Sequence, residues 1–391
     1  MKNKKLIIAL LCAYVGIMIA FCVIGTIPTG NNTWEQGATI YYPYNDTIFS
    51  EHPDSIIGSV YSKNEIESIE IQIEPGDYVI PVERQKIYYN GEEILTLATF
   101  ESSVDFGLNP NKYEAAVVIN DAEGQHKYDS VEFSIAKQES FSTVGKFEMF
   151  SVQHIIALGA VIIAYFAALL YYKRKPSEKR KNVIYLILAA CIVLCDFAVK
   201  LWLLKNQVFK VSYDAFLHMC DISGPLLIIL FFMKDSLKRQ KLFSLMIIWG
   251  LWGAFMALLT PEMRGNAFPS LYFMTFFIKH GAIVIGVLIL GVMEKYSPKY
   301  KHLPIVLLIS GIIVAIIYGI NQLMVFLPPF EVGNYMFLSY PPTGGSAIDI
   351  MVQVFGPSPY YIIGMGVLAI VLYTITWLVY WMAGKMKKEE K

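Results

Sequence analysis

The sequence predicts a membrane all-α bundle of seven spanning helices, preceded by an N-terminal anchor helix and an extracellular all-β sandwich. Of the 391 residues, 55% are hydrophobic and only 16% are charged, whereas soluble domains contain ~25% charged residues. Eight apolar stretches are long enough to cross a bilayer, which takes ~20 residues. Residues 28–147 stand apart, with 20 acidic and 7 basic residues. This composition excludes a single water-soluble globule and a disordered chain.

The anchor is the first apolar stretch. It follows a basic N-terminus, but it is too long for a signal-peptide core and no small-x-small cleavage site follows promptly, so we expect an uncleaved anchor. Three domains are predicted: the anchor over 1–27, the β-sandwich over 28–147 and the seven-helix domain over 148–391. The eight predicted spans are Leu6–Thr26, Ser151–Tyr172, Asn182–Leu204, Ser212–Met233, Lys241–Thr260, Phe268–Met293, Leu303–Leu327 and Ser358–Ala383.

The distribution of lysine and arginine orients the bundle. With the N-terminus inside, the segments on that side carry 20 Lys and Arg, whereas the short loops on the opposite side carry three. We therefore expect a multi-pass protein of the cell membrane with both termini cytoplasmic and residues 28–150 extracellular. The inside segments are 1–5, 173–181, 234–241, 294–302 and 384–391.

Residues 28–147 alternate apolar and polar side chains, which is typical of half-buried strands. The alternation is clearest at 69–73, 113–119 and 131–135, and turns are expected at Pro75-Gly76-Asp77, Asn90-Gly91 and Glu123-Gly124. The runs Ile57–Ser62 and Tyr113–Ile119 resemble those of bacterial immunoglobulin-like domains. We expect this segment to bind an extracellular ligand or an envelope protein, or to act as a spacer. Its acidity argues against nucleic acid.

Polar residues inside the spans indicate where function lies, because a charge at mid-bilayer costs roughly 2.5–3.5 kcal/mol. A rise of ~1.5 Å per residue places most of them in the outer half of the bundle. This clustering predicts a cavity open to the outer side and disfavours a through-channel. The residues are His154, Asp196, Lys200, Asp214, His218, Cys220, Asp221, Lys279, His280, Asn321 and Gln322.

Cys220 is a candidate nucleophile. Its neighbours His218 and Asp221 share a helix face, so Cys220 points elsewhere and its base is expected from another helix. His280 is the best candidate for that base, and the adjacent Lys279 would favour the thiolate. Core packing is the alternative for Cys220, and a snorkelling, structural role is expected for Lys200 and Asp214.

No metal or cofactor is expected. The Cys and His spacings match no metal-binding pattern, although His154 could converge with His218 and His280 in space. The sequence has no glycine-rich phosphate loop and no G-x-S-x-G elbow.

Taken together, residues 148–383 resemble YwaF-like bacterial membrane proteins and transmembrane protein 164, a phospholipid acyltransferase. The resemblance implies acyl transfer between lipids, with Cys220 as nucleophile and His280 as base. Asn321, Asn334 or Tyr335 is expected to donate a hydrogen bond to the oxyanion. Asp221 is expected to orient His218 or a residue of the predicted helix Asn182–Leu204. The landmarks are His154, Leu217–Ser223, Phe276–Gly281, Asn321, Gly333–Leu338, Pro341, Asp349 and Gly356–Tyr361.

Two other functions compete with this one. The chain would be a non-enzymatic envelope sensor if the β-sandwich bound a ligand and the helices transmitted or anchored the signal. A transporter is less favoured, because no paired broken helices or inverted repeat stands out. Membrane lipids are the expected partners of the helical domain.

Overall fold

The fold is seen in a computed structural model. The residues that it describes are 2–28, 30–43, 47–49, 53, 55–76, 78–83, 85–89, 92–103, 110–122, 124–136, 147–263, 266–327, 330–342 and 346–389. The predicted turn at Asn90-Gly91 and part of the other two turns, at Asp77 and Glu123, lie outside these residues.

The N-terminal part contains two β-sheets. One has the strand order β1-β3-β7-β6 and the other the order β2-β9-β8-β4-β5. The strands are β1 (Gln36–Tyr42), β2 (Thr47–Phe49), β3 (Ser55–Ser62), β4 (Ser68–Glu74), β5 (Tyr78–Pro81), β6 (Gln85–Tyr89), β7 (Glu92–Ser103), β8 (Lys112–Asp121) and β9 (Gly124–Ile135).

The predicted alternation sets the core of these sheets. Ile69, Ile71 and Ile73 of β4 are buried and lie opposite the buried Ile119, Val117 and Ala115 of β8. Side chains from both sheets join one apolar core, which includes buried residues of β1, β3, β4, β7, β8 and β9, as period-two patterning requires.

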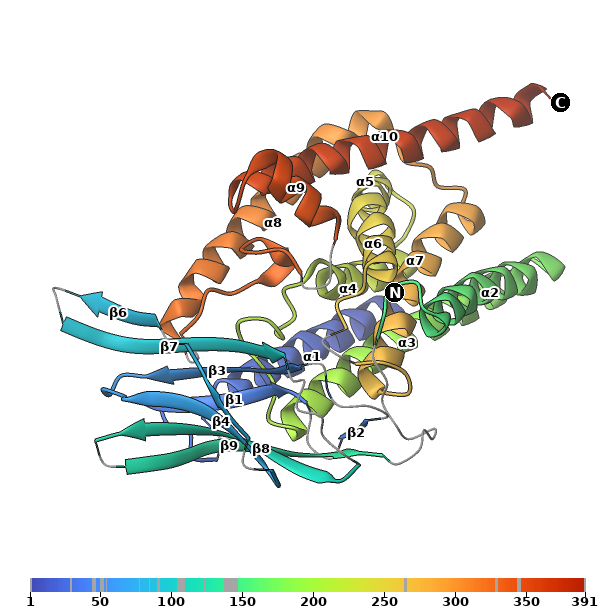
Figure 1. The fold of residues 1–391 in the computed structure, drawn as a ribbon. Helices are drawn as coiled ribbons and strands as arrows, with labels where there is room; N and C mark the ends of the chain where they lie inside the picture. The colour runs from blue at the N-terminus through green and yellow to red at the C-terminus, as the bar shows by residue number, and fades with distance from the viewer. Residues whose placement is uncertain are drawn as a thin grey trace.

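The helical part begins with α1 and resumes after the sheets (Figure 1). Figure 1 shows the strands gathered at one end of the helices, with α1 beside α3. The helices are α1 (Lys2–Gly25), α2 (Val152–Arg174), α3 (Glu178–Lys205), α4 (Met219–Phe232), α5 (Leu237–Met246), α6 (Gly253–Leu259), α7 (Leu271–Met293), α8 (Leu303–Leu323), α9 (Ala347–Phe355) and α10 (Tyr360–Glu389).

Six helices of the described chain are long and apolar enough to cross a membrane. A π-helical turn, Ile247–Trp252, joins α5 to α6 in a single span. The predicted count of seven core spans and an anchor is therefore not confirmed: Cys12–Gly25 and Met219–Phe232 are shorter apolar helices. The six spans are Val152–Arg174, Glu178–Lys205, Leu237–Leu259, Leu271–Met293, Tyr300–Phe326 and Tyr360–Ala383.

Helix α4 starts seven residues later than the predicted span at Ser212, because side chains hold the preceding stretch in a non-helical conformation. The Ser212 hydroxyl donates to Glu331 at 2.6 Å. The Asp214 carboxylate accepts the backbone N–H of Lys210 at 2.8 Å. These bonds compete with the i→i−4 ladder, and the helix begins only at Met219.

The sheets rest on the loop that follows α3. Val208, Phe209 and Val211 of that loop belong to the same apolar core as the strands. The ring of Tyr61 in β3 packs against Phe330, with centroids 5.3 Å apart. The β part is thus joined to the loops that lead to α4 and follow α8.

Candidate functional site

A cavity of about 470 Å³ lies between α3, α4, the π-helical turn, α7 and α10. This volume is within the ~300–1,000 Å³ range of small-molecule sites. A π-helical turn in a cavity wall is itself a feature that recurs at functional sites. Polar side chains that line the cavity include Lys200, Tyr213, His218, Cys220, Glu262, Lys279 and His280.

A buried ionic cluster lies beside this cavity. The Lys279 ammonium of α7 donates to the carboxylates of Asp196 in α3 and Asp221 in α4. The hydroxyl of Tyr14 in α1 donates to the second oxygen of Asp196 at 2.6 Å. All four side chains are at least nine-tenths buried. The cluster therefore joins four helices, and the bonds offset the cost of burying its charges.

This arrangement changes the expected role of Lys279. The sequence predicts that Lys279 favours the Cys220 thiolate and that Asp221 orients His218 or a residue of α3. The structure instead binds Lys279 to Asp196 and Asp221 together. Two carboxylates outweigh one ammonium, so Lys279 is not a free positive charge for the thiolate.

His280 presents one ring nitrogen to the cavity. Its Nδ1 lies 2.8 Å from the backbone oxygen of Phe276, which can only accept, so Nδ1 carries the proton. The ring also packs on Phe276, with centroids 4.2 Å apart. Nε2 has no hydrogen-bond partner in the described part of the chain and keeps its lone pair, as a general base requires.

His218 and His154 use both ring nitrogens for structure. His218 Nε2 lies 2.9 Å from Tyr213 O, and its Nδ1 accepts the N–H of Met336 at 3.3 Å. His154 Nδ1 accepts the N–H of Phe150 at 2.9 Å, and its Nε2 lies 2.8 Å from Leu258 O. His218 lines the cavity, but His154 is not among its lining residues. The described residues contain no group of three or more His, Cys, Asp or Glu arranged to hold a metal ion.

Cys220 is in the first turn of α4 and lines the same cavity as His280. Its side chain is partly exposed, whereas the following Asp221 is buried. The sequence predicts that Cys220 and His280 lie in one polar region on separate helices, and both residues line this cavity.

Asn321, Asn334 and Tyr335 hold a loop in place. Asn321 pairs with the backbone of Tyr335 through both amide atoms, at 3.0 and 3.1 Å. The Asn334 side-chain oxygen accepts two backbone N–H groups at 3.2 Å. These three residues do not line the cavity; the next two, Met336 and Phe337, do, and both have a positive φ. The clamp maintains this strained backbone at the cavity wall.

Among the polar lining residues, Lys200, Tyr213 and Glu262 were not predicted to belong to the site. Lys200 was assigned a snorkelling role, yet it is 8% exposed and lines the cavity. Tyr213 lies at the start of a predicted span, and Glu262 lies in a predicted loop. The two side chains form a hydrogen bond with each other at the cavity. The signal for Lys200 was its charge within a predicted span; nothing in the sequence paired Tyr213 with Glu262.

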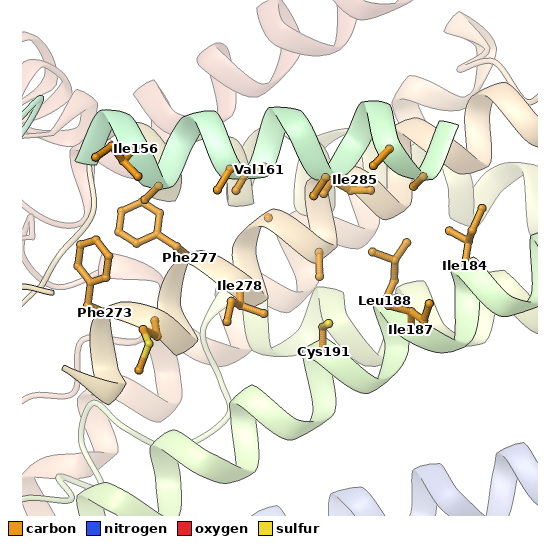
Figure 2. Close-up of a pocket in the computed structure, with 18 of the residues that line it drawn as sticks. Ile156, Val161, Ile184, Ile187, Leu188, Cys191, Phe273, Phe277, Ile278 and Ile285 are labelled. Carbon is orange, nitrogen blue, oxygen red and sulfur yellow. The ribbon is translucent and has the colours of Figure 1, made fainter. Parts of the chain in front are cut away.

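A second hollow of about 1100 Å³ lies on another side of α7, between α2 and α3 (Figure 2). The α2 and α7 backbones approach closely at Gly281, where a Cβ atom would lie 2.7 Å from Val161 Cγ2. Figure 2 shows its apolar lining, including Ile156, Val161, Ile184, Ile187, Leu188, Cys191, Phe273, Phe277, Ile278 and Ile285. We call this hollow the apolar groove.

The helices and the cavity define the class of protein: a multi-pass membrane protein with a polar cavity among its helices. The sequence matches the TMEM164 family over residues 149–377, which is more than half of the chain, and the chain belongs to this family. The match covers every candidate site residue from His154 to Tyr335 and leaves α1 and the strands outside it. No curated protein matches the sequence.

Proposed function

We propose that the chain is a membrane acyltransferase, which moves acyl chains between lipids or onto a lipid-linked acceptor. The carrying observation is that Cys220 and His280 line one cavity. Of the three histidines His154, His218 and His280, only His280 keeps a ring nitrogen without a partner in the described residues. A thiol and an imidazole base are a known nucleophilic pair.

In the first step His280 Nε2 takes the thiol proton, and the Cys220 sulfur attacks the ester carbonyl carbon of the donor. The ester C–O bond breaks, the alcohol leaves with the proton from His280, and a thioester remains on Cys220. In the second step Nε2 takes the proton of the acceptor hydroxyl, whose oxygen attacks the thioester. The C–S bond breaks, and the thiol regains the proton.

Orientation follows the charge bias of the loops. We propose that both termini are cytoplasmic, that residues 28–150 are extracellular and that the cavity opens toward that side. Gln125→Cys places a thiol in the exposed β8–β9 hairpin. In a background without other cysteines, a membrane-impermeant maleimide should label this thiol in intact cells. Labelling only after permeabilisation would reverse the orientation.

We further propose that residues 28–147 form an immunoglobulin-like domain that binds an extracellular ligand or an envelope protein. Its contact with the helical part supports an alternative function, a non-enzymatic envelope sensor. The Lys210 ammonium lies 4.6 Å from the Tyr41 ring centre and 2.5 Å from a Glu331 oxygen. A ligand bound to the strands would thus act on the loop before α4.

The test compares cellular lipids. Wild type, Cys220→Ala and Cys195→Ala are expressed in the same bacterial host, and acyl-chain distributions are measured by mass spectrometry. Cys195 also lines the cavity, so its variant is a matched control. We expect wild type and Cys195→Ala to shift the distribution and Cys220→Ala to equal the empty vector. If Cys220→Ala shifts the distribution as wild type does, the acyltransferase proposal is rejected in favour of the envelope sensor.

A further inference from the structure

The first turn of α4 is open at its N-terminal end. His218 precedes the helix and makes no side-chain cap, because its ring is bonded to Tyr213 and Met336. The backbone N–H groups of Asp221 and Ile222, the third and fourth residues of the helix, donate to His218 O. The N–H groups of Met219 and Cys220 have no acceptor within the described chain. A helix start carries about half a positive charge, so these two donors favour an anion.

Lys200 is an independent observation at the same cavity. Its side chain comes from α3, is 8% exposed and lines the cavity. Among the described residues it has no ion pair within 4.0 Å. Asp221 lies within electrostatic range but is bonded to Lys279, and Asp214 accepts the N–H of Lys210. A buried ammonium that contacts no carboxylate directly has its N–H donors available to another partner, which indicates an anionic ligand.

We propose that Lys200 and the N–H groups of Met219 and Cys220 form an oxyanion-binding site beside the Cys220 thiol. The inference rests on the proposed function and deepens it. The ligand is a negatively charged oxygen of the lipid substrate. One source is the ester carbonyl oxygen, which gains charge when the sulfur attacks; the other is a headgroup phosphate. Covalent geometry keeps the N–H of Cys220 near its own sulfur, so the carbonyl oxygen is the closer source.

One pair of variants removes a single N–H donor. Proline is tolerated at the first helical position, and the extended backbone of His218 (φ −69, ψ 154) suits a residue before proline. Met219→Pro and Met219→Ala both lose the thioether, but only Met219→Pro loses the N–H. We expect thioester formation on Cys220 to be about 10²-fold slower in Met219→Pro than in Met219→Ala.

A second set of variants tests the charge and does not depend on the proline variant folding. Lys200→Met should slow acylation by about tenfold or more, while Lys200→Arg should retain most of the rate because it keeps the charge. Lys205→Met, at the exposed end of the same helix, is the control and should acylate at the wild-type rate. Melting temperatures of the full-length proteins in detergent report folding separately.

Two acyl donors distinguish the sources of the oxyanion. 4-Nitrophenyl palmitate has an ester but no phosphate, whereas an alkyne-tagged phosphatidylcholine has both. If Lys200→Met slows both donors, Lys200 binds the carbonyl oxygen; if it slows only the phospholipid, Lys200 binds the phosphate. Either result supports the site. The site is overturned if Lys200→Met and Met219→Pro match their controls with both donors. A wild-type protein that forms no thioester would refute the proposed function itself, and the site with it.

Discussion

Helix α7 separates two hollows of opposite character. Phe277 and Ile278 face the apolar groove of Figure 2, whereas Phe276 and His280 face the polar cavity. Lys279, between them in sequence, is bonded to two carboxylates beside the cavity. Because successive helical residues point in different directions, one helix supplies both surfaces. In α7, the charged residue Lys279 therefore lies on the side where carboxylates from two other helices meet it.

Removing the lysine of the cluster should give the largest loss of stability. Lys279→Met leaves Asp196 and Asp221 buried and facing each other, which should cost about 3–5 kcal/mol. Thermal melting in detergent and size-exclusion chromatography measure this loss. Ile278→Ala, one residue away and 48% exposed toward the groove, should cost less than about 1 kcal/mol. Equal losses would show that the two faces of α7 do not differ as described.

The contribution of α1 to the cluster is the next largest effect. Tyr14→Phe removes one hydrogen bond to a buried carboxylate, which should cost about 1.5–3 kcal/mol. The control is Ile19→Val, because Ile19 is 50% exposed on the same helix. The readout is again the melting temperature of the full-length chain. If Tyr14→Phe is as stable as its control, the hydrogen bond from α1 does not stabilise the cluster.

Asp129 of β9 offers a contrast with the paired carboxylates of the helices. It accepts the N–H of Ile40 at 2.7 Å, and burial raises its pKa to about 6. Because the unfolded pKa is ~3.9, the folded state binds more protons between these values, so stability should fall as pH rises from about 4 to 6 and then level off.

Asp129→Asn tests this pH dependence in the β-sheets, away from the helical cluster. At pH 7.5 the variant should be more stable than wild type by up to about 2–3 kcal/mol, and the gap should close near pH 4. Circular dichroism of the full-length chain, followed at the strand signal, measures melting across this range. A gap that widens toward low pH would contradict the assigned direction.

The sequence predicted the elements that depend on local pattern. Ile69, Ile71 and Ile73 alternate with polar residues and form a buried strand, as expected from period two. The start of α4 was not predictable, because Ser212 is held by Glu331, 119 positions away. An apolar run shows that a helix is favourable, but distant side-chain bonds decide where it begins.

The same limit applies to the site. Depth along each span predicted that Cys220 and His280 lie in one polar region, and both line the cavity. Depth does not give the direction in which a side chain points around the helix axis. The pairing of Lys279 with Asp196, and of Asp196 with Tyr14 from the distant N-terminus, therefore required the structure.

The proposed acyl transfer requires a covalent acyl group on the Cys220 sulfur, and this adduct can be detected. Purified full-length protein is mixed with an alkyne-tagged phospholipid, digested, and analysed by mass spectrometry with and without hydroxylamine. We expect a hydroxylamine-sensitive adduct on the Cys220 peptide of wild type and Cys195→Ala, and its loss in His280→Gln. An adduct on another cysteine, or one of undiminished yield in His280→Gln, would contradict it.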